Sequence, residues 1–219
     1  GVDRFAKSNY FTTVNLHLMW LLKKTPHDVM CGYNYYRILS EDSLTCEVVG
    51  GRRLKNIYIA EKVIFNDKEY RTVSVAEDAF GGRRIQSVYI PEGVKEIGAN
   101  AFDRCVKLVS LHLPASVEKI GISSFESLKE LRSLQLSENI KEIPMKAFVS
   151  CGNLKKLVIP EGVEELGLDC FAICTGLEEV TWPSTLTTIK RGVFWHCTSL
   201  KEISIPASVE TIGEYVLHD

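Results

Sequence analysis

The sequence predicts a single elongated repeat solenoid, because three kinds of position recur every 23 residues without a slip. An apolar residue followed by proline or serine stands at Ile90-Pro91, Leu113-Pro114, Leu136-Ser137, Ile159-Pro160, Trp182-Pro183 and Ile205-Pro206. A phenylalanine register comprises Phe102, Phe125, Phe148, Phe171 and Phe194, with Leu217 in the next place. A leucine register comprises Leu108, Leu131, Leu154, Leu177 and Leu200. This period and leucine spacing are typical of leucine-rich-repeat solenoids.

Residues 108–130 show the first half of one repeat. Leu111 and Leu113 have the period-2 spacing of a strand with one buried face. Pro114 then ends the strand, because proline has no backbone N–H to donate. We therefore expect one short strand per coil, all on the same side of the solenoid.

The second half of the repeat is a short return side with a corner. Val117 and Ile120 bracket two charged residues, which indicates apolar ends inside and charge outside. Gly121 suits a turn with positive φ, although Pro144 and Lys190 stand at equivalent positions. Phe125 fills the last corner. Since no coil buries its own apolar face, the core exists only where coils stack. The corners are expected to be short helical or 3-10 turns in a mostly β structure, with about six to seven coils.

The composition argues against a nucleic-acid-binding protein and against a membrane-spanning helix. The 219 residues carry a net charge of −2, and no Lys/Arg-rich run appears, so nothing favours nucleic acid as a partner. No apolar stretch reaches the roughly 18 residues that a membrane helix needs.

The region before the repeats divides in two. Residues 1–27 are interpreted as a packing element, a disordered or vector-derived leader, or a partner-binding helix, and the sequence leaves these alternatives open. The segment does not fit a secretory signal, since Asn15 and His17 interrupt its apolar run and the lysine pair follows that run. Residues 28–53 predict a β-hairpin that caps the amino-terminal end of a solenoid spanning 54–219.

An insertion of about nine residues interrupts the first coil. Asn66-Asp67-Lys68 predicts a hairpin turn that carries Phe65 and Tyr70. The insertion either widens the cap or forms a binding loop, because solenoid insertions map to one face.

These residues carry a family resemblance. The pattern Leu-x-x-Leu-x-Ile-Pro-x-x-Val-x-x-Ile-Gly-x-x-Ala-Phe-x-x-Cys is clearest at 85–105 and 154–174 and resembles the BspA-like leucine-rich repeats of bacterial surface proteins. Residues 35–42 and 66–70 also look like amino-terminal elements of that family. The resemblance covers about 28–219 and implies a secreted or surface-attached protein that serves in adhesion and partner interaction.

The seven cysteines are interpreted mainly as buried thiols. Cys105, Cys151, Cys174 and Cys197 share one repeat position with Leu128, which marks it as an apolar slot. Whether Cys31 and Cys46 form a disulfide across the cap is left open. Zinc is not expected, since Cys170 and Cys174 have no second ligand pair at metal spacing.

No catalytic constellation is recognisable, so we expect no enzyme activity and no cofactor. None of the five histidines sits in a nucleophile or metal motif, and no phosphate-binding glycine loop occurs. Trp182 and Trp195 are expected in or near the core.

The candidate site is therefore the sheet face, where strand residues between core positions point outward. The proposed partner-binding residues are Tyr58, Tyr89, His112, Gln135, Lys156 and Glu179. Aromatic side chains on a rigid sheet are good contact anchors. The favoured hypothesis is an adhesin-like module that binds a protein or glycan. The alternative is a structural spacer or envelope component that self-associates through its carboxy-terminal coil.

Overall fold

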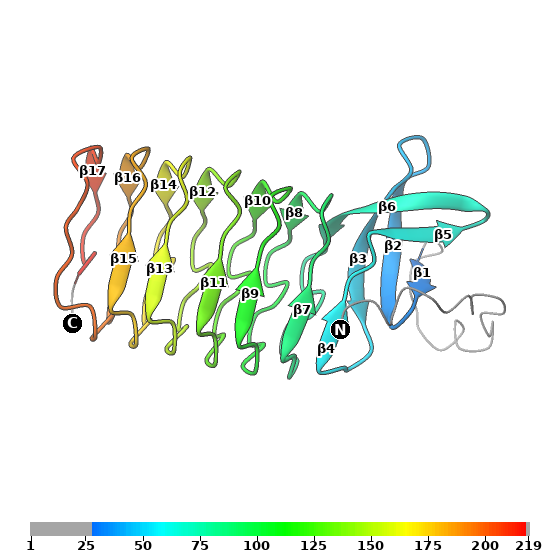
Figure 1. The fold of residues 1–219 in the computed structure, drawn as a ribbon, viewed down its shortest axis with the longest axis horizontal. Helices are drawn as coiled ribbons and strands as arrows, with labels where there is room; N and C mark the ends of the chain where they lie inside the picture. Colours follow the sequence, from blue (N-terminus) through cyan, green and yellow to red (C-terminus); the bar gives the residue numbers. More distant parts are fainter. Residues whose placement is uncertain (1–27, 218–219) are drawn as a thin grey trace.

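The structure is a computed structural model that describes residues 28–217 and shows a rod of stacked coils closed at its amino-terminal end by a small sheet (Figure 1). The predicted β-solenoid of about seven coils is confirmed. One detail of the expectation is wrong: the described residues contain no helical turn, and the coil corners are plain turns. The corners hold isolated turn bonds, such as Cys105 N to Phe102 O and Leu108 N to Cys105 O, and also bond to the neighbouring coil, as Phe102 N does to Ser124 O. The expectations for residues 1–27 lie outside the described residues.

Each regular coil contributes two short strands on opposite sides of the rod. We call one row the front strands: β4 (Asn56–Tyr58), β7 (Ser87–Tyr89), β9 (Ser110–His112), β11 (Ser133–Gln135), β13 (Lys156–Val158) and β15 (Glu179–Thr181). The back strands are β8 (Glu96–Ile97), β10 (Lys119–Ile120), β12 (Glu142–Ile143), β14 (Glu165–Leu166), β16 (Thr188–Ile189) and β17 (Thr211–Ile212). Neighbouring coils pair in parallel and in register.

A column of phenylalanines forms the centre of the rod. Phe80 and the five predicted phenylalanines each have no more than 1% of their surface exposed. Successive rings stack nearly parallel, with centroids 5.2–6.0 Å apart. Leu217 takes the next place but is 52% exposed, because no described coil covers it. The identical spacing in sequence therefore becomes a continuous apolar column.

The hydrogen-bonded ladders beside this column are not continuous. The front strands pair only in twos: β4 with β7, β9 with β11 and β13 with β15. The back strands form one ladder through β8 and β10 and another through β12, β14, β16 and β17.

Pro144 explains the interruption between β10 and β12. In other coils the residue in this slot donates its N–H to the coil before it, as Gly121 does to Ile97 O and Gly167 to Ile143 O. Pro144 has no N–H to donate to Ile120 O. The back ladder therefore stops at this coil.

The expectation that Gly121 needs positive φ is wrong. Its φ lies outside the left-handed region, and a Cβ placed there would approach Ala99 N to 2.4 Å. Gly98 and Gly167 show equally close approaches to the preceding coil. Glycine is used in this slot because successive backbones pass so near each other.

The amino-terminal end is covered by β1 (Asp28–Cys31), β2 (Asn34–Ser40) and β3 (Thr45–Gly51), which pair antiparallel. Their side chains bond the backbone of the first coil, since Asn34 Nδ2 donates to Tyr58 O and Ala60 N donates to Tyr36 Oη. Burial raises the pKa of the Tyr36 hydroxyl to about 12. The predicted domain boundaries remain predictions.

The insertion forms a hairpin of β5 (Lys62–Phe65) and β6 (Lys68–Val75). Asn66 and Asp67 make its turn with φ of 48° and 58°, a conformation that Asn and Asp tolerate. Because β6 also pairs with β3 and β8, this strand joins the cap sheet to the back ladder.

All seven cysteines are free thiols. Strand register places Cys31 opposite Asn34 and Cys46 opposite Ile38, on either side of β2, so the pair left open in the sequence is not bridged. The repeated cysteines donate to the carbonyl of a phenylalanine in the coil before: Cys105 to Phe80, Cys151 to Phe125, Cys174 to Phe148 and Cys197 to Phe171. The shared cysteine slot is therefore a buried structural position.

The two tryptophans differ. Trp182 is partly buried and meets Phe194 edge-on, with ring centroids 5.8 Å apart, as expected for a residue near the core. The expectation for Trp195 is wrong: its side chain lies on a corner, is 38% exposed and packs against His196.

Candidate functional site

The six candidate residues all lie exposed on the front strands. Tyr58, His112 and Lys156 come from β4, β9 and β13, and Tyr89, Gln135 and Glu179 come from the strands that pair with these. The structure thus brings the candidates together as three separate pairs.

Tyr58 and Tyr89 form an exposed aromatic stack. Their ring centroids are 4.8 Å apart, the planes differ by 6°, and the residues are 63% and 51% exposed. The inner faces of the two rings cover each other, so each tyrosine offers its outer face, its edge and its hydroxyl group. Burial beside the partner ring raises the pKa of Tyr58, and nearby Tyr89 and Glu61 act in the same direction. Tyr58 therefore stays protonated at neutral pH and offers a hydrogen-bond donor.

Lys156 and Glu179 bind each other. The Lys156 Nζ lies 2.7 Å from a Glu179 carboxylate oxygen, and hydrogen bonding to that carboxylate raises the pKa of Lys156. Lys155 and Glu178 form a second ion pair beside the first. Both pairs are solvent-exposed, so they stabilise the coil contact only slightly. Their main effect is that this end of the front face is electrically neutralised.

Sequence reasoning missed a group of cations on the segments that precede the tyrosine-bearing strands, five residues before each tyrosine. Arg53 and Arg84 are exposed in the segments that lead into β4 and β7. The available signal was a repeated Gly-Gly-Arg-Arg at 50–53 and 81–84. The insertion in the first coil spaces these copies 31 residues apart, so a search at the 23-residue period overlooks them.

The back of the rod carries a groove of about 780 Å³ at the Pro144 interruption. Its lining residues are Glu96, Glu118, Lys119, Ile120, Asn139, Lys141, Glu142 and Pro144. Three glutamates and two lysines lie in this lining, so the groove presents charges of both signs close together.

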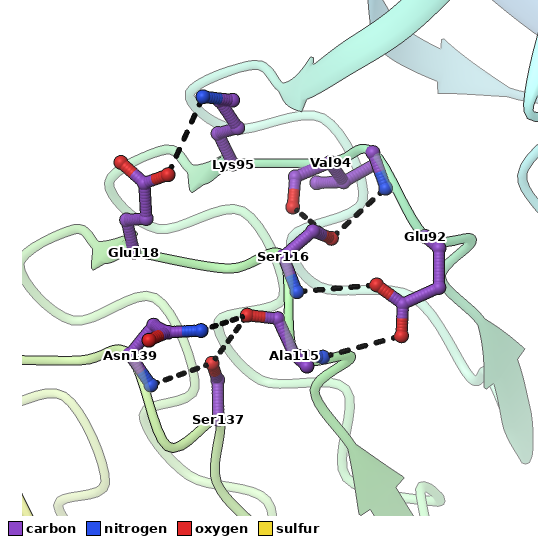
Figure 2. Close-up of polar contacts among 9 residues, drawn as sticks. Glu92, Val94, Lys95, Ala115, Ser116, Glu118, Ser137 and Asn139 are labelled. Atoms are coloured by element: carbon purple, nitrogen blue, oxygen red, sulfur yellow. Dashed lines mark hydrogen bonds and ion pairs between the residues drawn. The ribbon is translucent and has the colours of Figure 1, made fainter.

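Polar groups beside the groove are used to hold neighbouring coils together (Figure 2). The Glu92 carboxylate accepts hydrogen bonds from the backbone N–H groups of Ala115 and Ser116. Ser116 Oγ donates to Val94 O, and Lys95 forms an ion pair with Glu118. Glu161 and Ser184 repeat the carboxylate contact three coils later. These contacts are structural.

Residues 28–217 contain no cluster of three or more His, Cys, Asp or Glu side chains arranged to hold a metal ion. Within the same range, no helix is long and apolar enough to cross a bilayer.

The repeat pattern agrees with a known family model. The BspA type leucine rich repeat region, in six copies, matches residues 53–176 and 95–219. The chain belongs to this BspA type family. The resemblance inferred from the sequence is thereby confirmed. A search of curated proteins found no match.

Solved structures share this fold. A leucine rich cell surface protein from Faecalibacterium prausnitzii is 30% identical, with a TM-score of 0.79, over 90% of this chain and 53% of that one. A leucine-rich repeat protein from Eubacterium ventriosum is 23% identical, with a TM-score of 0.75, over 88% and 49%. The T. pallidum leucine rich repeat protein is 24% identical, with a TM-score of 0.65, over 80% and 91%. The chain thus spans about half the length of the first two proteins.

Proposed function

We propose that this chain is a non-enzymatic interaction module of a bacterial cell-surface or secreted protein, which binds a macromolecular partner through its front face. Family membership supports a role in protein interaction, and the F. prausnitzii protein is described as a cell surface protein. An adhesin-like role and an extracellular location are part of the proposal.

The observation that carries the proposal is the exposed stack of Tyr58 and Tyr89. Large aromatic side chains with a hydroxyl group are enriched among residues that dominate binding energy at interfaces. Here the backbone of two hydrogen-bonded strands holds them at a fixed spacing. A rigid surface loses little conformational entropy on binding, so many weak contacts add to a useful affinity.

The test is a binding screen of the intact chain against extracellular proteins and glycans, followed by substitution. For any partner found, Tyr58→Ala, Tyr89→Ala and His112→Ala together should raise Kd by at least about tenfold, or 1.4 kcal/mol. A matched control changes three exposed back-side residues, Lys119→Ala, Lys141→Ala and Glu142→Ala, and should leave Kd unchanged. Unaltered binding by the front-face triple variant contradicts the proposal.

The alternative function is self-association as a spacer. In the last described coil Ile212 and Tyr215 are 55% and 53% exposed, and among the described strands β17 pairs with β16 alone. Light scattering tests it: a concentration-dependent dimer that Ile212→Glu and Tyr215→Glu disperse supports this function, and a monomer at all concentrations contradicts it.

A further inference from the structure

Like charges lie side by side where the chain enters β4 and β7. Asn56 lies opposite Ser87, and Gln86 N donates to Lys55 O, so the register carried back along both segments sets Arg53 beside Arg84. Arg83 supports this alignment, since its Nη1 donates to Gly51 O in the neighbouring segment. Adjacent like charges destabilise a strand pair.

No acid in the described part of the chain compensates these cations. The ion pairs of residues 28–217 include neither Arg53, Lys55 nor Arg84. Arg83 differs, because it is bonded to backbone carbonyls and lies over the Phe80 ring, with its guanidinium carbon 5.2 Å from the centroid. Arg83 therefore has a structural role in the fold, whereas Arg53 and Arg84 form no ion pair with any residue from 28 to 217.

Elsewhere, many coil contacts place opposite charges together. Lys107 pairs with Glu130, Lys155 with Glu178, Lys156 with Glu179, Lys95 with Glu118 and Lys190 with Glu165. The amino-terminal end of the front face is thus cationic, whereas the lysines at the other end are neutralised. A surface on which the arginines have no ion pair within residues 28–217, and lead into strands that end in exposed tyrosines, is complementary to an anionic partner.

We propose that Arg53, Lys55 and Arg84, together with the stack of Tyr58 and Tyr89, form a docking surface for an acidic peptide segment of a partner protein. The arginine forks bind carboxylates through two parallel hydrogen bonds. The tyrosine hydroxyl groups form hydrogen bonds with the peptide backbone, and the ring edges contact its apolar side chains. This inference rests on the proposed function and specifies its partner.

The geometry of the tyrosines favours a peptide over a glycan. Sugars pack on the open face of an aromatic ring, and the mutual stacking of Tyr58 and Tyr89 at 4.8 Å closes one of the two faces of each ring. Exposed Val109, in the segment just before β9, adds apolar surface that a sulfated glycan has no side chain to match.

The experiment measures the fluorescence anisotropy of a labelled peptide of about twelve residues, which is about four turns of an extended helix with three residues per turn. In this peptide, two of every three residues are Glu and the third is Leu. The variant Arg53→Gln with Arg84→Gln should raise its Kd about tenfold or more, and salt should weaken wild-type binding as the Debye length shortens. The matched control, Lys95→Gln with Lys190→Gln, removes two positive charges as well but from ion-paired lysines on the back of the rod, and should change Kd less than about twofold.

Three further arms separate the alternatives. The same peptide with Gln for Glu should not bind, and Tyr58→Phe with Tyr89→Phe should weaken the acidic peptide while the thermal midpoint stays unchanged. Equal losses in the arginine and lysine variants would show general electrostatic attraction and overturn the proposal. Arginine-dependent binding of heparin in preference to the peptide would overturn it in favour of a sulfated glycan.

A folding defect is controlled by Arg53→Lys with Arg84→Lys, which keeps the charges and should retain more binding than the glutamine variant. If the peptide fails to bind while the front-face triple variant still loses a natural partner, the acidic preference is wrong and the proposed function stands.

Discussion

The rod contains two aromatic stacks that run along the same axis and differ in what surrounds them. The phenylalanine column has centroid spacings of 5.2–6.0 Å and is sealed in the core, whereas Tyr58 and Tyr89 stack at 4.8 Å on the front face. Stacking alone therefore does not identify a structural residue. The phenylalanines remove apolar area from water, whereas the tyrosines leave most of theirs exposed and available to a partner.

Truncating the inner stack should have the largest effect. Phe125→Ala removes a fully buried ring between Phe102 and Phe148 and should lower the free energy of unfolding by roughly 3–5 kcal/mol. Chemical denaturation followed by circular dichroism measures this. A loss below about 1 kcal/mol would contradict a tightly packed column.

The buried cysteine thiols, which donate to phenylalanine carbonyl groups, should make the free energy of unfolding fall at alkaline pH. Burial raises the pKa of Cys105 from 9.0 to about 11, so the folded protein keeps this proton after the unfolded chain has lost it. The contribution of this thiol to the free energy of unfolding is complete below pH 9 and is lost as pH rises toward 11. The loss should be about 1–3 kcal/mol. Cys105→Leu, which copies Leu128 in the same slot, should flatten this part of the pH profile of urea unfolding.

Truncating the outer stack should affect stability much less. Tyr89→Ala removes one stacking contact on an exposed surface, for which we expect a loss of about 1 kcal/mol or less. The midpoint of thermal unfolding measures it beside that of Phe125→Ala. An equal loss in the two variants would remove the distinction between the stacks.

The smallest effect should come from the ion pair on the same front face. A double-mutant cycle of Lys156→Ala and Glu179→Ala should give a coupling free energy smaller than the effect of either variant above, and it should decrease with added salt. A coupling that equals the loss in Phe125→Ala would mean that these side chains stabilise the coil contact beyond what exposed charges normally do.

The sequence predicted the positions that follow the 23-residue repeat, but not the effects of the positions that interrupt it. Equal spacing was sufficient to place the phenylalanines and the front-face candidates, because identical slots stack directly. The reason for Gly121 was misjudged, since sequence spacing does not show how closely two backbones pass. Pro144 was noticed in the glycine slot, but its effect lies in a hydrogen bond to another coil. Arg53 and Arg84 were missed because the insertion shifts their spacing away from the period.

Pro144 also gives the rod an uneven bending stiffness. At the contact between β10 and β12 the back ladder is absent, so the coils are held together there by the phenylalanine column, the front pair of β9 and β11 and corner bonds such as Phe125 N to Ala147 O. A force across the rod would be accommodated first by widening the back groove. The cationic tyrosine end and the neutralised lysine end of the front face would then tilt relative to each other, which adapts one stiff surface to partners of different curvature.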